Sequence, residues 1–327
     1  MESTKRKRVL TGIQPSGKLH IGNYFGTIKR MIEYQECSDL FLFVANLHCL
    51  TSLSDPKAIR ELTLNAAMDM LSLGIDPERT YFWAQSDVPE VTELMWILST
   101  LTPFGLMERA HSYKDKTAKG IQASLGLFSY PVLMAADILI YQADVVPVGK
   151  DQKQHLEITR DIALKFNHQY GDVLTIPEPD ISEGVAVIPG TDGQKMSKSY
   201  NNTIPIFADE KGWKKTVMSI VTDSKSVEDA KDPDACNVCQ LYKLFATPEE
   251  QKALAKRYRQ GGLGYGDAKK MLLEKVIATF EPYAKKRARY QAHPEEVKTI
   301  LKKGAEKVRP IAQKTLEKVR KLVGIEY

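Results

Sequence analysis

The first 145 residues alternate short apolar runs with longer segments of helical periodicity, and this alternation constrains the fold more than any other feature. The apolar runs are 9–13, 41–45 and 80–84, and helical segments follow at 56–73 and 91–101. Strands that alternate with helices form a parallel sheet with helices on both faces. We therefore expect an α/β fold, a Rossmann-like doubly wound parallel sheet that binds ligands at the strand carboxyl ends.

A short motif, His20-Ile21-Gly22-Asn23, follows the first strand and the turn cluster Gln14-Pro15-Ser16-Gly17. Apolar residues recur at helical spacing after it, so the motif is expected at a helix N-terminus. Free backbone N–H groups and the helix dipole favour phosphate there. His20 can donate a hydrogen bond to phosphate oxygens, and Gly22 lets a flat ring lie on the backbone. Taken alone, the four residues also fit an ordinary helix start with a chance histidine.

A second motif, Lys195-Met196-Ser197-Lys198-Ser199, begins 175 residues after the first. The segment 190–193, Gly-Thr-Asp-Gly, predicts a flexible turn before it. Two lysines three residues apart can neutralise the charge that develops on a departing pyrophosphate. An isolated loop of this kind is usually only solvated, but the two motifs together indicate activation of a substrate by ATP.

The two motifs resemble the paired HIGH and KMSKS signatures of class I aminoacyl-tRNA synthetases, with Asn23 in place of the last histidine. Together with the segments 14–17, 130–139 and 146–155, they make the chain similar to the bacterial-type tryptophanyl-tRNA synthetases over nearly its whole length. The resemblance implies a Rossmann-like catalytic domain of the class I synthetase type over 1–199, with an inserted helical element near 108–145. It also implies a C-terminal α-helical domain over 200–327 that binds the tRNA anticodon.

The resemblance assigns seven residues to a tryptophan pocket. Asp137 would accept the indole N–H, Tyr130 and Gln152 would hold the α-ammonium group, and the walls would be Met134, Val146, Val148 and His48. An indole carries one N–H donor on a large apolar body, so a selective pocket needs one buried acceptor between apolar walls. The neighbours of Asp137 are apolar, which favours a buried carboxylate over an exposed one. Leu10 stands where close relatives often carry phenylalanine, so the pocket floor is expected to differ in shape.

The resemblance also implies ATP as a substrate, with Mg²⁺ bridging its phosphates. The implied contacts are Gln14, Pro15, Ser16, Gly22 and Asn23 below the nucleotide, Gly149, Lys150 and Asp151 at the ribose, Val187 at the adenine, and Lys195, Met196, Ser197, Lys198 and Ser199 at the leaving phosphates. His20, Lys195 and Lys198 are the implied catalytic residues. A pocket that reads a specific polar group can reject analogues lacking it by about 10⁴–10⁵, so no editing site is expected.

The net charge of +5 conceals an asymmetry along the chain. From residue 250 onward 20 Lys and Arg stand against 9 Asp and Glu, a balance of +11, and the preceding residues carry −6. Two amphipathic helices with basic outer faces are expected at 268–292 and 294–323. A basic face is often only solvated, but in a synthetase it is the expected contact for the tRNA for tryptophan. The family further implies a homodimer in which one tRNA spans both subunits.

The four cysteines do not form a disulfide framework in a chain of this length, so we expect reduced thiols. Cys236 and Cys239 have metal-ligand spacing, but a closed site needs about four ligands, and no metal site is expected. No stretch approaches the roughly 20 apolar residues that cross a bilayer, and the N-terminus lacks an apolar signal region. We therefore expect a cytoplasmic protein without a membrane contact.

Three other functions remain open at this point. A tyrosyl-tRNA synthetase shares the fold and related motifs, but would ordinarily add a C-terminal RNA-binding domain for which a chain ending at Tyr327 has no room. A non-catalytic descendant could bind RNA or partner proteins, although it would have no reason to keep His20, Gly22, Lys195 and Lys198. A plain nucleotidyltransferase could share the segment 195–199, which we call the lysine loop.

Overall fold

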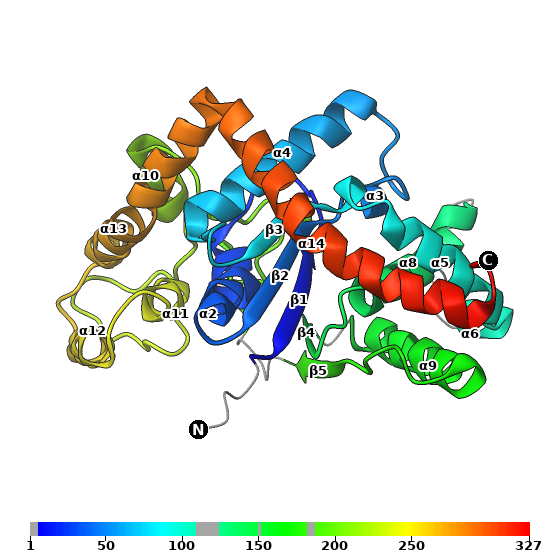
Figure 1. Ribbon diagram of the computed structural model, residues 1–327. Helices are drawn as coiled ribbons and strands as arrows, with labels where there is room; N and C mark the ends of the chain where they lie inside the picture. The colour runs from blue at the N-terminus through cyan, green and yellow to red at the C-terminus, as the bar shows by residue number, and fades with distance from the viewer. Residues whose placement is uncertain (1–5, 109–123, 150–151, 182–186) are drawn as a thin grey trace, which may run out of the picture. The chain divides into compact units, whose positions relative to one another are not determined.

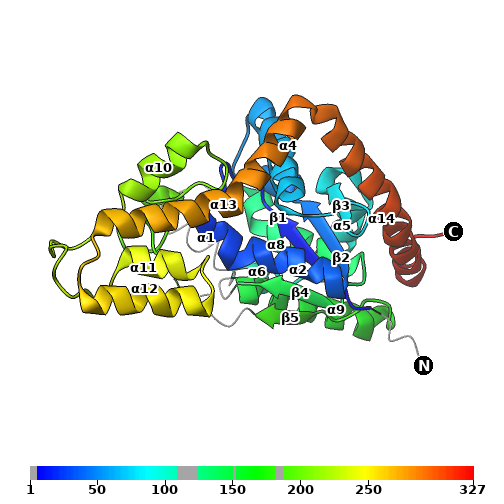
Figure 2. The same ribbon diagram turned by 90° about the vertical axis from the view of Figure 1, so that its left-hand side faces the viewer.

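The computed structural model describes residues 6–108, 124–149, 152–181 and 187–327 (Figures 1 and 2). By compactness the chain divides into two units. Unit 1 comprises Met1–Gly17, Glu33–Glu183 and His293–Tyr327, and unit 2 comprises Lys18–Ile32 and Gly184–Ala292. These units do not coincide with the functional division expected at residue 199, which stays a prediction.

Unit 1 is built on a five-stranded parallel sheet, which confirms the α/β expectation. Its strands are β1 (Arg8–Ile13), β2 (Asp39–Val44), β3 (Tyr81–Ala84), β4 (Val145–Val148) and β5 (Glu178–Ile181). They lie in the order β3-β2-β1-β4-β5, and every neighbouring pair is parallel. The winding therefore reverses between β1 and β4, and ligands in such sheets bind where the carboxyl ends flank that reversal.

The central strands consist of apolar residues because both faces of the sheet are covered. In β2, all five residues from Leu40 to Val44 are buried, and in β3 Phe82, Trp83 and Ala84 are buried. Such near-continuous apolar runs are typical of parallel strands between helical layers. The sequence periodicity had placed these two strands at 41–45 and 80–84, in agreement with the structure.

Helices and helical turns surround the sheet in unit 1. They are α3 (Asn46–Cys49), α4 (Pro56–Leu73), η2 (Gln85–Asp87), α5 (Glu90–Leu101), α6 (Phe104–Glu108), α8 (Leu125–Leu139), α9 (Lys153–Tyr170) and α14 (Pro294–Val323). The helix α2 (Lys29–Cys37) contains the boundary between the units. The helix α4 begins where the Asp55 side chain accepts the Lys57 N–H and ends at Gly74, which has a positive φ of 120°.

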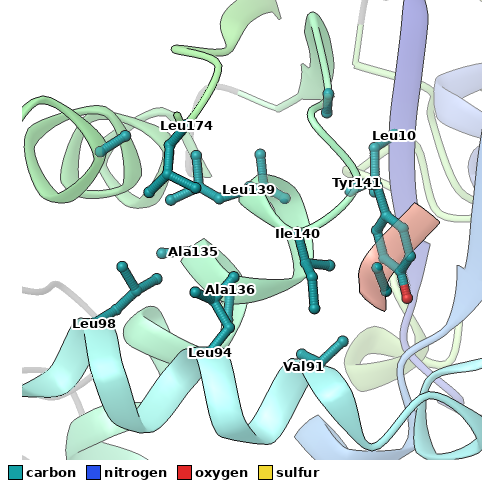
Figure 3. Packing of buried hydrophobic residues seen from close by; sticks show 14 of the residues in the cluster. Leu10, Val91, Leu94, Leu98, Ala135, Ala136, Leu139, Ile140, Tyr141 and Leu174 are labelled. Atoms are coloured by element: carbon teal, nitrogen blue, oxygen red, sulfur yellow. The ribbon is translucent and has the colours of Figure 1, made fainter. Parts of the chain in front are cut away.

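Part of the core of unit 1 lies between α5 and α8 (Figure 3). Val91, Leu94 and Leu98 of α5 point toward α8, where Ala135 and Ala136 present small side chains. All five residues are buried, and the two alanines let the helices approach closely. This packing holds α8, the helix that carries Asp137, in a defined orientation.

The helix α14 covers the edge of the sheet at β3, the outermost strand. Gly304 makes this possible, because a Cβ atom there would lie 1.8 Å from the carbonyl oxygen of Phe82. Arg309 adds an ion pair to Glu90 at the start of α5, with 2.7 Å between Nε and Oε1. A covered edge strand cannot pair with another chain, so α14 also closes the sheet on that side.

Within its described residues, unit 2 consists of helices and loops. They are α1 (Ile21–Asn23), the π-helix η1 (Tyr24–Ile28), η4 (Lys198–Tyr200), α10 (Glu210–Met218), α11 (Asn237–Lys243), α12 (Pro248–Gln260) and α13 (Tyr265–Ala292). An aromatic cluster ties η1 to α13: the Tyr24 and Phe280 ring centroids lie 5.2 Å apart, and those of Phe25 and Phe245 lie 4.9 Å apart. This cluster explains why the segment 18–32 joins unit 2.

The two C-terminal helices expected at 268–292 and 294–323 are confirmed by α13 and α14. Of the inserted element expected near 108–145, residues 109–123 lie outside the described residues, and the described part contains α8. In the described part of the chain, no helix is long and apolar enough to cross a membrane.

Candidate active site

Asp137 lies on α8 with 2% of its surface exposed, which confirms that it is buried. Both oxygens of its carboxylate accept hydrogen bonds: Gln85 Nε2 donates to Oδ1 at 2.9 Å and to Oδ2 at 2.8 Å, and His48 Nε2 lies 3.0 Å from Oδ2. Burial raises the pKa of Asp137, while the bonds from His48 and Gln85 oppose that increase. The result is a hydrogen-bond acceptor surrounded by apolar core.

Helical spacing places Tyr130, Met134 and Asp137 on one face of α8, since they stand at positions i, i+4 and i+7. The Tyr130 ring lies 6.1 Å from the His48 ring, and its hydroxyl lies 2.6 Å from His155 Nε2. The structure therefore brings His48 to both Tyr130 and Asp137, and Met134 shares the face of α8 on which they stand. That these residues form a tryptophan pocket stays a prediction. Tyr130 reaches His155 on α9, a contact that the sequence did not suggest.

Val146 and Val148 are alternate residues of β4, and both are buried. Period-two spacing directs them to the same face of the sheet. Gln152 is exposed directly before α9 and donates its backbone N–H to Gly149 at 3.0 Å. Leu10 lies in the buried core of unit 1 (Figure 3), and its effect on the pocket floor stays a prediction.

Residues expected at the nucleotide follow the two strands that flank the reversal of winding. Gln14, Pro15 and Ser16 come directly after β1, and Gly149 comes directly after β4. Because β1 and β4 are neighbours, both segments lie at the same edge of the sheet. Lys150 and Asp151 lie outside the described residues.

His20 directly precedes α1, as the sequence predicted, and its backbone is extended with φ −126° and ψ 165°. Asn23 Oδ1 accepts the His20 N–H at 3.1 Å, so this asparagine closes the first turn of the helix. A Cβ atom on Gly22 would lie 2.9 Å from His20 Nδ1 and 3.4 Å from Met196 Sδ. Glycine at position 22 therefore permits the imidazole and the second motif to lie against the same backbone.

The His20 imidazole is buried, and its Nδ1 has no hydrogen-bond partner among the described residues. Burial, together with the positive charge of Lys198, lowers the pKa of His20 to about 4. The ring is consequently neutral at physiological pH and still able to donate one hydrogen bond.

The lysine loop is held by Asn202, a buried residue that the sequence did not single out. Asn202 Oδ1 accepts the Ser197 N–H at 2.8 Å, and its Nδ2 donates to Asp192 Oδ1 at 2.7 Å and to the Lys195 carbonyl at 3.1 Å. Met196 is buried, whereas Lys195 and Lys198 are exposed. The loop is thus anchored at its backbone, and its two lysines lie at the surface. Val187 is 66% exposed.

Cys236 and Cys239 are buried and reduced. A hydrogen bond from Cys239 lowers the pKa of Cys236 to about 6. No group of three or more His, Cys, Asp or Glu that could hold a metal occurs among the described residues.

Sequence reasoning missed Gln85, Asn202 and His155. Gln85 carried one usable signal, because a polar residue directly after an apolar parallel strand stands at the ligand-binding edge of the sheet. Asn202 and His155 are recognisable only from their contacts in three dimensions.

The chain is similar in sequence and fold to several known proteins. The family described as tRNA synthetases class I (W and Y) matches residues 2–281. The chain is 56% identical over 318 residues to a tryptophan–tRNA ligase of Campylobacter jejuni, covering 97% of this chain and 100% of that protein. It is 52% identical over 320 residues to a tryptophan–tRNA ligase of Fusobacterium nucleatum, covering 98% of each. The crystal structure of tryptophanyl-tRNA synthetase from Campylobacter jejuni complexed with ADP and tryptophan superposes with a TM-score of 0.92 at 56% identity, covering 97% of this chain and 99% of that one.

Proposed function

The chain belongs to the tryptophanyl-tRNA synthetases of class I, and on this premise we propose how its own residues carry the reaction. It is a tryptophan–tRNA ligase that activates L-tryptophan with ATP and transfers it to the cognate tRNA. The buried carboxylate of Asp137 is the observation in this structure that supports tryptophan as the substrate. A buried acceptor between apolar walls suits one N–H on a large flat ring.

In the first step, a carboxylate oxygen of tryptophan attacks the α-phosphorus of ATP. The new bond to phosphorus forms as the bond to the bridging oxygen breaks, and pyrophosphate leaves with that electron pair. Lys195 and Lys198 stabilise the leaving charge, and neutral His20 donates a hydrogen bond to phosphate oxygen. No side chain acts as a nucleophile, so catalysis rests on position and charge.

The other ATP contacts follow the family positions. Gln14, Pro15, Ser16, Gly22 and Asn23 bind the nucleotide from below, Gly149, Lys150 and Asp151 the ribose, Val187 the adenine, and Met196, Ser197 and Ser199 the phosphates with the two lysines. Mg²⁺ supplies charge neutralisation on the phosphates. The described residues hold no cluster of metal ligands, which fits an ion that arrives with ATP.

Tryptophan binds through the residues gathered around α8. Asp137 accepts the indole N–H, and Met134, Val146, Val148 and His48 wall the ring. Tyr130 and Gln152 hold the α-ammonium group. In the second step a ribose hydroxyl of the tRNA attacks the activated carbonyl, and AMP leaves.

The active form is a homodimer. Exposed apolar side chains on three elements of unit 1 support this: Trp96 is 72% exposed, Phe104 67% and Leu125 79%. The helices α6 and α8 pack together, and the Phe104 and Phe128 rings lie 4.7 Å apart. A second copy would remove this apolar surface from water.

The basic helices α13 and α14 bind the phosphate backbone of the tRNA. On α14, Lys303, Lys314 and Lys318 are exposed, and among the described residues none of the three forms an ion pair. Lysines without acidic partners are available to bind the phosphate groups of the tRNA. Aminoacylation of tRNA places the protein in the cytoplasm, where translation uses the product.

The deciding experiment is amino-acid-dependent exchange of labelled pyrophosphate into ATP, with all twenty amino acids tested separately. We expect exchange with tryptophan alone. Exchange with tyrosine would preserve the mechanism but contradict the pocket assignment, and no exchange with any amino acid would contradict the assigned activity.

A further inference from the structure

Gln85 is a buried polar side chain to which the reaction described above gives no role. It is the first residue of η2, directly after β3, and 1% of its surface is exposed. Its Nε2 donates to both oxygens of Asp137, and its Oε1 accepts the backbone N–H of Leu47 at 3.0 Å. One amide therefore joins the end of β3 to α8 and to α3.

The Gln85 amide can occupy this position in only one orientation. The Leu47 N–H needs an acceptor, so the amide oxygen must face Leu47 and the NH₂ group must face Asp137. If the amide were reversed, its oxygen would face the Asp137 carboxylate and its NH₂ group would face the Leu47 N–H. Neither pair can form a hydrogen bond. Hydrogen-bond chemistry thus guarantees that Asp137 always meets a donor on this side.

This arrangement determines which acceptor position of Asp137 stays open. Each carboxylate oxygen has about two acceptor positions. Oδ2 receives one hydrogen bond from Gln85 and one from His48 Nε2, so both of its acceptor positions are occupied. Among the described residues Oδ1 receives a bond from Gln85 only, so one position on Oδ1 remains available.

We propose that Gln85 is a positioning residue for tryptophan selectivity: it orients the Asp137 carboxylate so that the open position on Oδ1 receives the indole N–H. The inference rests on the proposed function, in which Asp137 reads that N–H. Gln85 does not touch the substrate in this scheme and acts only through Asp137.

A second set of contacts separates this role from simple support of the fold. The adjacent residue Ser86 is bonded to Asn46 of α3 twice: the Ser86 N–H donates to Asn46 Oδ1 at 3.0 Å, and Asn46 Nδ2 donates to Ser86 Oγ at 2.8 Å. These bonds hold α3 against η2 without Gln85. A substitution at Gln85 therefore alters the carboxylate while leaving the helix that carries His48 attached.

The charge state of Asp137 depends on the same contact. Asp137 is buried, and burial favours its neutral form. The hydrogen bonds from His48 and Gln85 oppose this effect. Without the Gln85 donor, Asp137 takes up a proton at higher pH, and a protonated carboxyl has lost part of its capacity to accept the indole N–H.

The test compares tryptophan with the analogue in which sulfur replaces the indole N–H, using pyrophosphate exchange by the full-length protein. Gln85→Met keeps the side-chain length and removes both the donor and the acceptor. We expect kcat/KM for tryptophan to fall about 10- to 100-fold, mainly through KM, and kcat/KM for the analogue to change less than about threefold. Equal losses for both substrates would mean a merely structural role and would overturn the inference.

Gln85→Glu keeps the shape and serves as a conservative variant if Gln85→Met fails to fold. Its carboxyl can still accept the Leu47 N–H, but it donates to Asp137 only when protonated. We expect its kcat/KM for tryptophan to rise as the pH falls from 8 to 6, a trend opposite to that of Gln85→Met. A pH profile identical to that of the unsubstituted protein would overturn the inference.

Two further variants separate the failure of this inference from failure of the proposed function. Ser86→Ala removes a hydrogen bond from the same turn and should leave discrimination between the two substrates unchanged. Asp137→Asn should reduce discrimination at least tenfold. If Asp137→Asn leaves discrimination intact, the proposed recognition of the indole fails and the inference with it. If Asp137→Asn reduces discrimination and Gln85→Met does not, only the role of Gln85 fails.

Discussion

Burial affects two polar residues in opposite ways, Asp137 in unit 1 and His20 in unit 2. Asp137 is bonded by Gln85 and His48, and its pKa is raised. His20 keeps a ring nitrogen without a partner among the described residues, and its pKa is lowered to about 4. Buried polar atoms are usually satisfied within the protein, so an exception such as His20 is typical of a group that bonds a substrate. The sequence motif identified His20, but it could not reveal that the ring is neutral.

The lysine loop offers the first prediction at this scale. Lys195 is exposed and its carbonyl is anchored by Asn202, so the side chain can be removed without disturbing the loop. Lys195→Ala should slow adenylate formation about 10²- to 10³-fold and leave the Kd for tryptophan within about twofold. Single-turnover kinetics and calorimetric titration measure the two quantities. Equal losses in both would contradict a role confined to the transition state, and Lys211→Ala, another exposed lysine of unit 2, provides the control.

The lowered pKa of His20 predicts a pH dependence of stability. The folded protein binds fewer protons than the unfolded chain between the folded pKa of about 4 and the ordinary value of 6.5. The contribution of His20 to stability is therefore complete above about pH 7 and decreases as the pH falls toward 4. We expect this to cost about 2 kcal/mol between pH 7 and pH 5.

The measurement is the unfolding free energy at pH 7 and pH 5 for the unsubstituted protein and for His20→Gln. The variant should lose about 2 kcal/mol less than the parent over this range, whatever its absolute stability. The idea is wrong if the two proteins lose the same amount.

At the scale of elements, the predicted binding residues lie where strands end and helices begin. Gln14 to Ser16 follow β1, Gly149 follows β4, Gln85 follows β3 and His20 precedes α1. Turn and cap signals in the sequence predicted several of these boundaries, because they arise from local backbone chemistry. The order β3-β2-β1-β4-β5 makes β1 and β4 neighbours, and this adjacency depends on pairing across more than 130 residues.

The contact between α14 and β3 gives a prediction about an element. Gly304 costs helix propensity but leaves room for the Phe82 carbonyl oxygen. Gly304→Ala should destabilise unit 1 by about 3 kcal/mol or more, because backbone rather than a flexible side chain blocks the new methyl group. Faster amide hydrogen exchange throughout α14 and a lower Tm would show the effect.

Gly266→Ala is the matched control. Gly266 is exposed on α13, and no atom lies within 4 Å of a Cβ placed there. Alanine should be neutral or stabilising by up to about 1 kcal/mol at that position. If Gly304→Ala behaves like this control, the close approach of α14 to β3 does not contribute to stability.

At the scale of the whole molecule, both ATP motifs belong to unit 2, whereas the residues around Asp137 belong to unit 1. Close contacts of Gly22 with Met196, and the aromatic packing of Tyr24 on Phe280, join segments far apart in the chain. The spacing of the motifs along the sequence carries no information on this grouping.

The exposed apolar residues of unit 1 lead to a prediction about assembly. If the proposed dimer forms through this surface, Trp96→Glu should shift the protein from dimer to monomer in sedimentation equilibrium. It should also lower tRNA charging more than tryptophan activation, because the proposed tRNA contact spans both subunits. Val221→Glu alters a 55% exposed apolar residue of unit 2 and should leave the dimer intact. A monomeric parent protein, or an unchanged dimer in Trp96→Glu, would contradict the placement of this interface.

The sequence by itself determined the α/β class, the positions of its main strands and helices, and the chemistry of the two ATP motifs. These follow from periodicity and local backbone preferences, which act over a few residues. Only the tertiary structure decided that Gln85 and His48 bond Asp137, that Asn202 anchors the lysine loop, and that 18–32 joins 184–292. Such contacts join residues distant in the chain through packing of the whole fold, and no local pattern specifies them.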